Sequence, residues 1–201
     1  LVKSRMSVRR NPDHPDAAAP LSLDGEDVEL VSLHLDGEPV GDNRYRLDED
    51  GLTLDDVPDS FTLDIETRIR PHENTELSGL YVSGGNFTTQ CEAQGFRRIT
   101  FFPDRPDVMA RYTTTVVADK KACPILLSNG NPVDGGEADP GRHWAKWDDP
   151  WPKPSYLFAL VAGDLVAHED SFTTASGREV PLKIYVRRED PDRCAFAMES
   201  L

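Results

Sequence analysis

The sequence has no long apolar run and almost no helical periodicity. A membrane-spanning helix needs about 18 or more consecutive apolar residues, and no such run occurs in the 201 residues. The opening stretch, Leu1 to Arg5, lacks the apolar core of a secretory signal. Because the chain opens on Leu1 and not on methionine, we expect a trimmed natural N-terminus. We expect no membrane partner.

Cysteine is scarce. The three cysteines, Cys91, Cys123 and Cys194, are an odd number in a chain too long to depend on disulfides. A reduced, cytoplasmic protein is the simplest interpretation. Cys91 invites comparison with a catalytic nucleophile, but cysteine is among the most buried residue types. We therefore expect a buried, unreactive thiol at this position.

Positive charge is also scarce. Lysine and arginine number 22 against 36 aspartates and glutamates, which gives a formal net charge of -14. This balance argues against nucleic acid and anionic membranes as partners. The acidic residues gather in turn-like stretches such as Asp36-Gly37, Asp48 to Gly51 and Asp55-Asp56. Most of the charge is therefore attributed to solvated loops, and attraction of cationic peptides is a secondary interpretation.

Local metal-binding motifs are missing. The five histidines are His14, His34, His72, His143 and His168. No two of them are about three to five residues apart, the separation that local metal-ligand pairs use. We expect each to be a surface or strand histidine, and we expect this chain to hold no metal.

What the sequence does contain is alternation typical of β-strands. Val28 to Leu35 alternates apolar and polar residues, Asp36-Gly37 supplies a hairpin turn, and Phe61 to Ile69 alternates again. Further expected strands are Arg97 to Phe102, Ala110 to Ala118, Ile125 to Ser128, His143 to Trp147, Tyr156 to Ala162, His168 to Thr174 and Pro181 to Arg187. Helical character is expected only near Asp107 to Ala110 and in Arg193 to Leu201. The pattern predicts an all-β fold, a twisted antiparallel β-sandwich or saddle.

Three tryptophans, Trp144, Trp147 and Trp151, lie close together in the sequence. Exposed aromatic rings can form a stacking platform for sugars or bases. Trp144 and Trp147 are three residues apart and would point to opposite faces of a strand, so core and loop packing is favoured. Pro150 to Pro154 is expected to be a stiff connector.

The segment Thr88 to Arg98, TTQCEAQGFRR, carries the strongest chemical signal. In an extended strand Gln90, Glu92 and Gln94 would share one face, and Cys91 and Ala93 the other. An amide oxygen beside a carboxylate suits a protonated α-amine, which has three donors and one positive charge. The alternative is that these polar side chains only cover the solvated face of a strand.

Several segments in order resemble the zinc aminopeptidase N (alanyl aminopeptidase) family, most closely its bacterial branch. They are Gly79-Leu80-Tyr81, the Gln-Cys-Glu-Ala stretch, Arg105-Pro106-Asp107, Leu127 to Asn131 and Tyr156 to Asp164. The resemblance covers most of the chain from about Leu21 onward. It implies that residues 1–201 are an N-terminal β domain whose first strands precede Leu1, so that Leu1 to Arg10 begins inside a sheet. About residues 166–201 would lead into the zinc-peptidase domain.

By this resemblance, Gln90 and Glu92 match the family's amine-binding pair, and peptide N-termini are the substrate. The intact enzyme would remove single N-terminal residues, with broad preference for small and basic side chains. Neither the family's H-E-x-x-H zinc helix nor its G-A-M-E-N motif is present, so both are expected beyond Leu201, and the chain alone is expected to be inactive. The partner would be the catalytic domain in cis, within a monomer. A free-standing β-sandwich adaptor or carbohydrate-binding module remains the alternative.

Overall fold

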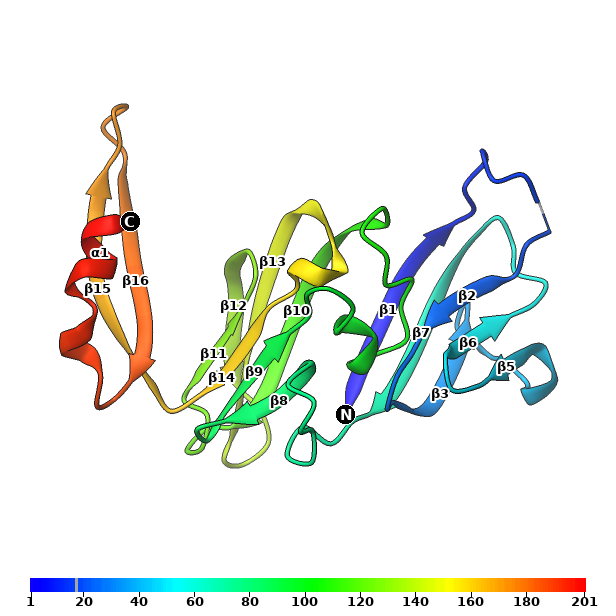
Figure 1. The fold of residues 1–201 in the computed structure, drawn as a ribbon, viewed down its shortest axis with the longest axis horizontal. Helices are drawn as coiled ribbons and strands as arrows, with labels where there is room; N and C mark the ends of the chain where they lie inside the picture. The colour runs from blue at the N-terminus through cyan, green and yellow to red at the C-terminus, as the bar shows by residue number, and fades with distance from the viewer. Residues whose placement is uncertain (17) are drawn as a thin grey trace. The chain divides into compact units, whose positions relative to one another are not determined.

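The structure, a computed structural model, describes residues 1–16 and 18–201 (Figure 1). Antiparallel β-strands make up most of the regular structure. The expected all-β class is therefore confirmed. The chain divides into two compact units, described separately below. The first contains Leu1–Val82, Thr88–Tyr112 and Asp149–Ala159, and the second contains Ser83–Phe87, Thr113–Asp148 and Leu160–Leu201.

The first unit contains two sheets. One has the strand order β1-β7-β3-β4 and the other β2-β6-β5. Their bounds are β1 Val2–Arg9, β2 Leu21–Asp24, β3 Glu29–Leu35, β4 Glu38–Pro39, β5 Tyr45–Leu47, β6 Gly51–Leu54 and β7 Ser60–Arg68. β1 pairs with β7 from Val2 opposite Thr67 to Arg9 opposite Ser60. Val2–Arg9 is therefore the strand at one end of this four-stranded order.

The predicted hairpin turn at Asp36-Gly37 joins β3 to β4. His34 pairs with Pro39 and Leu35 with Glu38, so Asp36 and Gly37 are the two turn residues. Both adopt positive φ, 52° and 86°, as the tight hairpin turns that match strand twist require.

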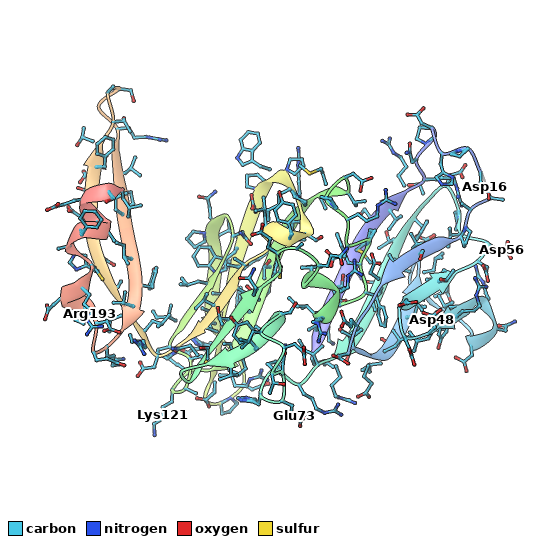
Figure 2. The ribbon with its side chains drawn as sticks, viewed as in Figure 1. Asp16, Asp48, Asp56, Glu73, Lys121 and Arg193 are labelled. Carbon is cyan, nitrogen blue, oxygen red and sulfur yellow. The ribbon has the colours of Figure 1, made fainter. Side chains whose placement is uncertain are left out.

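Acidic side chains occupy the connections between strands. Asp16, Asp48, Asp56 and Glu73 are exposed and lie outside the strands (Figure 2). Charges at such positions keep their hydration when the chain folds. The negative charge of this part of the chain is therefore largely solvated loop charge, as the sequence indicated.

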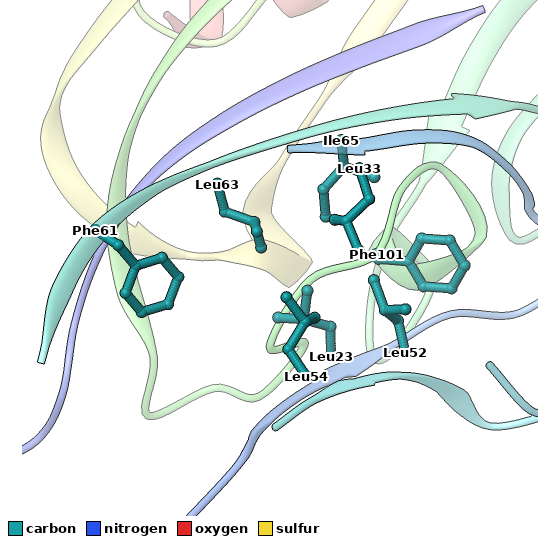
Figure 3. Packing of buried hydrophobic residues seen from close by; sticks show 8 residues of the cluster. All are labelled: Leu23, Leu33, Leu52, Leu54, Phe61, Leu63, Ile65 and Phe101. Carbon is teal, nitrogen blue, oxygen red and sulfur yellow. The ribbon is translucent and has the colours of Figure 1, made fainter. Parts of the chain in front are cut away.

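The two sheets of the first unit enclose one hydrophobic core (Figure 3). The buried cluster is Leu23, Leu33, Leu52, Leu54, Phe61, Leu63, Ile65 and Phe101. β7 contributes every second residue, Phe61, Leu63 and Ile65, because alternate side chains of a strand point to one face. The arrangement is a β-sandwich.

The second unit has a smaller core formed by Cys123, Leu126 and Ala162. Two further sheets have the strand orders β11-β14-β9-β8 and β10-β13-β12. Their bounds are β8 Gly79–Ser83, β9 Asn86–Gln90, β10 Met109–Asp119, β11 Ile125–Ser128, β12 Asn131–Glu137, β13 Arg142–Pro154 and β14 Leu160–Gly163.

Two of the three tryptophans are partly buried within the second unit. Trp144 and Trp147 are half-buried, and the Trp147 indole N–H donates to the Leu126 carbonyl at 3.1 Å. Trp151 is 75% exposed. Packing of Trp144 and Trp147, the favoured interpretation, agrees with these positions.

A separate hairpin ends the chain. β15 (Leu165–Thr173) pairs along its whole length with β16 (Glu179–Arg187), and the short helix α1 (Ala195–Ser200) lies beside them (Figure 1). The strands expected at residues 168–174 and 181–187 and the helix expected within 193–201 are confirmed.

Of two further predicted strands, one is wrong and the other is confirmed only at its end, Leu160 to Ala162. Arg97 to Phe102 is a 3-10 turn, Phe96–Arg98, followed by a buried run that meets β2 through a single bridge between Phe102 and Asp24. Tyr156 to Ala162 is a 3-10 turn, Ser155–Leu157, and then β14. Tyr156 to Ala162 is apolar throughout, and Ile99 to Phe102 are all buried, so neither segment shows the alternation of inward and outward residues that distinguishes a half-buried strand from a buried turn.

Two other local predictions are also wrong. The proline-rich stretch from Pro150 to Pro154 is not a separate connector, because it continues β13 to Pro154. Proline fits a strand where its missing N–H faces no partner. The helical turn expected at residues 107–110 is replaced by the start of β10 at Met109.

Candidate functional site

The candidate amine-binding residues lie on a turn and not on a strand. β9 ends at Gln90, and residues 92–95 form the turn that precedes the 3-10 segment Phe96–Arg98. The predicted continuous strand from Gln90 to Gln94 is therefore wrong. Gln90, Glu92 and Gln94 are nevertheless all exposed and Cys91 is buried, while Ala93, expected to face inward, is exposed.

Gly95 explains why the chain turns here. Its N–H donates to the Cys91 carbonyl at 2.8 Å. A Cβ at Gly95 would lie 2.3 Å from the Gln90 carbonyl oxygen and 2.9 Å from the Gly79 nitrogen. Both neighbours are backbone atoms, which cannot move aside as a flexible side chain can. Only glycine allows this turn to close on the end of β9.

Gln90 and Glu92 are joined by a direct hydrogen bond. The Gln90 side-chain nitrogen donates to the backbone carbonyl of Glu92 at 3.2 Å. The Glu92–Ala93 peptide bond is cis. The Gln90 amide oxygen is left as an acceptor, and the exposed Glu92 carboxylate supplies the charge. The turn thus presents an amide oxygen and a carboxylate from residues two apart in sequence.

An aromatic cluster lies within the same unit. The Phe96 ring makes edge-on contacts with Phe102, Tyr112 and Phe158 at centroid distances of 5.0, 5.9 and 5.1 Å. Burial, with the negative charge of Asp104, raises the pKa of the Tyr112 hydroxyl. Phe96 follows Gly95 directly, so this cluster anchors the turn from its C-terminal side.

A buried carboxylate, Asp104, holds Arg97 in the 3-10 segment that follows the turn. Asp104 is 2% exposed. Its Oδ2 accepts from the backbone N–H and from Nε of Arg97, both at 3.1 Å. Its Oδ1 accepts from the Ser155 hydroxyl. The charge of Asp104 is therefore paired and hydrogen-bonded, as a buried carboxylate requires.

A second buried ion pair lies near Tyr112. Lys153 Nζ contacts Asp149 Oδ2 at 2.5 Å and lies 4.3 Å from the centre of the Tyr112 ring. The hydrogen bond from Lys153 lowers the pKa of Asp149. Nothing in the sequence spacing singled out Lys153, Asp149, Asp104 or Ser155. Asp104 directly precedes the Arg105 to Asp107 stretch of the resemblance, but pattern alone gave it no role.

Cys91 is a buried thiol, as expected. It is 3% exposed, and burial, helped by the negative charge of Asp104, raises its pKa to about 12. A thiol with so high a pKa carries almost no thiolate at neutral pH. Cys123 and Cys194 are likewise free and buried.

The described residues do not fit a zinc ion. Residues 1–16 and 18–201 contain no group of three or more His, Cys, Asp or Glu side chains arranged to hold a metal. His143 instead contacts the Cys123 carbonyl through Nε2 at 2.7 Å. Zinc ligands are therefore not assigned to this part of the chain.

No helix within the described parts of the chain is long and apolar enough to cross a membrane.

Sequence comparison identifies the relatives of this chain. A family described as the Peptidase M1 N-terminal domain matches residues 6–157. The chain is 52% identical over 200 residues to Aminopeptidase N of Caulobacter vibrioides, covering 100% of this chain and 23% of that protein. It is 54% identical over 188 residues to Aminopeptidase N of Escherichia coli, covering 94% and 21%. The chain therefore spans less than a quarter of the length of these curated relatives.

Solved structures agree. A crystal structure of Legionella pneumophila aminopeptidase A in complex with aspartic acid superposes with a TM-score of 0.93 at 40% identity, covering 98% of this chain and 23% of that one. An M1 zinc metallopeptidase from Deinococcus radiodurans, at 16% identity, shares the fold with a TM-score of 0.74 over 92% of this chain and 42% of that one. The resemblance found in the sequence motifs is confirmed: this chain belongs to the M1 peptidase family and carries its N-terminal domain.

Proposed function

We propose that residues 1–201 are the N-terminal domain of a zinc-dependent aminopeptidase that removes single N-terminal amino acids from peptides. In this proposal Gln90 and Glu92 bind the α-amine of the substrate. The observation that carries it is the turn at residues 90–95, where a carboxylate and an oriented amide oxygen are both exposed. The relatives named Aminopeptidase N support the activity of the whole protein.

The chemistry of a free N-terminus matches this pair. An α-ammonium group has three N–H donors and one positive charge, which the Glu92 carboxylate and the Gln90 amide oxygen can satisfy together. A peptide nitrogen inside a chain has one donor and no charge. The pair would therefore favour the terminal residue and set the register for removal of one amino acid at a time.

Zinc would be held elsewhere in the intact enzyme. The described residues provide no ligand set, and the sequence contains no H-E-x-x-H motif. The name of the Deinococcus relative, an M1 zinc metallopeptidase, supports zinc as the family's metal. The contribution of this domain is substrate binding, and bond cleavage belongs to the catalytic domain in cis.

The C-terminal hairpin is proposed to lead into that catalytic domain. The family match ends at residue 157, before β15 and β16, which pair only with each other in a two-stranded sheet. Phe172 on β15 and Phe196 on α1 are 55% and 82% exposed. Large exposed apolar side chains at a segment outside the family match suit a surface that further chain covers. We also propose a monomeric, cytoplasmic enzyme of peptide catabolism, consistent with three free cysteines.

A free-standing sugar- or protein-binding module has less support. It would need an exposed aromatic platform, but Trp144 and Trp147 are half-buried and the Trp147 N–H is already hydrogen-bonded.

Replacing Glu92 with Gln in the intact enzyme tests the proposal. The shape is kept and the charge is lost, so kcat/KM for aminoacyl substrates should fall roughly ten- to a hundredfold, about 1.5 to 3 kcal/mol. Zinc content and thermal stability should stay unchanged. Glu38→Gln, the same substitution at an exposed position on β4, is the matched control and should leave kcat/KM unaltered. Unchanged kinetics for Glu92→Gln, or loss of zinc, would contradict the assignment.

A further inference from the structure

We infer that Asp104 is a positioning residue for amine recognition: its buried carboxylate fixes the C-terminal end of the turn that carries Glu92. The inference rests on the proposed role of Glu92 and adds a residue that does not touch the substrate. It concerns only contacts inside the first unit.

The turn is exposed in its middle and fixed at its ends. Residues 92–94 are all exposed. Before them, Cys91 is buried and the Gln90 amide binds the Glu92 carbonyl. The position of the Glu92 carboxylate therefore depends on how firmly both ends are held. The sequence after Gly95 must supply the second anchor.

Asp104 supplies that anchor through the main chain. Its Oδ2 accepts the backbone N–H of Arg97 at 3.1 Å, and its own backbone oxygen accepts from Arg97 Nη2 at 3.1 Å. A bond to a backbone N–H fixes the path of the chain, whereas a bond to a side chain fixes only a rotamer. Arg97 lies five residues after Glu92.

Asp104 is itself held rigidly. Its backbone N–H donates to Asp24 Oδ2 at 2.9 Å, and the Ser155 hydroxyl donates to its Oδ1. Asp24 also contacts Arg97 Nη1 at 3.4 Å. In addition, Asp24 and Phe102 exchange two backbone hydrogen bonds, of 2.8 and 3.1 Å. Asp104 thus connects the 3-10 segment to β2 through its backbone N–H and to the Ser155–Leu157 segment through its carboxylate.

The carboxylate of Asp104 is fully engaged by protein groups. Oδ1 and Oδ2 accept three hydrogen bonds in total, two from Arg97 and one from Ser155. Groups that bind a substrate charge must be held within a fraction of an ångström, and a shift of about 1 Å can cost a hundredfold in rate. A rigid carboxylate under the turn is suited to limit such movement of Glu92.

The conservative variant Asp104→Asn isolates the charge. An asparagine can place its oxygen toward Arg97 and its nitrogen toward Ser155, whose hydroxyl can accept as well as donate. The number of hydrogen bonds is kept while the attraction to the Arg97 guanidinium is lost. Asp104→Ala removes all three bonds and serves as the stronger perturbation.

The experiment is a double-mutant cycle in the full-length enzyme with an alanyl arylamide as substrate. Asp104→Asn alone should raise KM roughly three- to tenfold with a smaller change in kcat, because a less firmly held Glu92 binds the substrate amine more weakly. In the Glu92→Gln background the same substitution should change kcat/KM by less than about twofold. Leu54→Ala, a core substitution in β6 that lies outside the network, controls for loss of stability and should combine additively with Glu92→Gln.

Each outcome decides between the two proposals. If Glu92→Gln has no effect, the amine-binding role fails. If Glu92→Gln impairs the enzyme while Asp104→Asn leaves KM unchanged, or if the two effects multiply independently, the positioning role of Asp104 is wrong. Should Asp104→Asn fail to fold, Ser155→Ala, which removes only the Oδ1 contact, replaces it in the same cycle and is judged by the same coupling.

Discussion

The side-chain amide of Gln90 donates to the backbone carbonyl of Glu92 at 3.2 Å. A carbonyl oxygen can only accept, so this bond fixes which end of the amide faces the turn. The nitrogen points to Glu92 and the oxygen is left for a ligand. One hydrogen bond therefore prepares Gln90 to act as an acceptor next to the Glu92 carboxylate.

Gln90→Ala should impair the intact enzyme less than Glu92→Gln. The substitution removes a neutral acceptor, which contributes about 0.5 to 1.5 kcal/mol against the larger effect of a charged one. We expect kcat/KM to fall roughly two- to tenfold. Gln94→Ala, on the same turn and equally exposed, is the control and should stay near the parent value. A larger loss from Gln90→Ala than from Glu92→Gln would contradict the ranking.

Gly95→Ala should destabilise the chain although alanine favours the backbone conformation found there. Gly95 has φ -85° and ψ -15°, angles that alanine adopts readily. The obstacle is a steric clash, because the alanine methyl group would lie 2.3 Å from the Gln90 carbonyl oxygen. We expect a loss of about 2 kcal/mol in unfolding free energy, measured by urea unfolding. Gly41→Ala is the control, because its nearest neighbour is the flexible Asn43 side chain at 3.1 Å. Equal stability of the two variants would count against close packing at Gly95.

The raised pKa of the Cys91 thiol predicts that the folded chain loses stability at alkaline pH. Its pKa is raised from 9.0 to about 12 in the folded chain, so the unfolded thiol ionises first. The contribution of the neutral thiol to the free energy of unfolding is fully present below pH 9 and declines as the pH rises toward 12. At pH 10.5 the free energy of unfolding should be lower than at pH 8 by on the order of 2 kcal/mol.

Cys91→Ala should weaken this pH dependence, measured by urea unfolding at pH 8 and pH 10.5. Tyr112, whose pKa burial also raises, is present in both proteins, so the difference reports Cys91 together with its charge interaction with Tyr112. If the unfolding free energy fell by the same amount between pH 8 and pH 10.5 in parent and variant, Cys91 would not contribute to the pH dependence.

Phe196 should matter more in the intact enzyme than in the 201-residue chain. Its ring is 82% exposed here, so Phe196→Ser should barely change the melting temperature of this chain. If later residues cover the ring, the same substitution in the intact enzyme should cost about 3 kcal/mol. Leu47→Ser, on β5 and 50% exposed, is the control. Equal effects of Phe196→Ser in both proteins would oppose the proposed continuation into a catalytic domain.

The sequence by itself determined two strands of the first unit, β3 and β7, and the inward position of Cys91. Phe61, Leu63 and Ile65 alternate with polar residues, and all three are buried. Alternation is a local property that follows from strand geometry, so it can be read without knowing the partners. The same holds for the Asp36-Gly37 hairpin, where the residues themselves tolerate positive φ. The ordered motifs likewise sufficed to identify the family.

Only the tertiary structure decided how Gln90 and Glu92 are presented. Period-two spacing predicted a strand through Gln94, but Gly95 packs on the Gln90 carbonyl and the Gly79 backbone, and the chain turns instead. A close approach between segments depends on space that no local pattern records. Asp104 is a second example, because a charged residue before a turn is ordinarily expected at the surface. It is buried because Arg97 and Ser155, seven residues before it and 51 after it, meet its two oxygens, and such pairing exists only once the fold has formed.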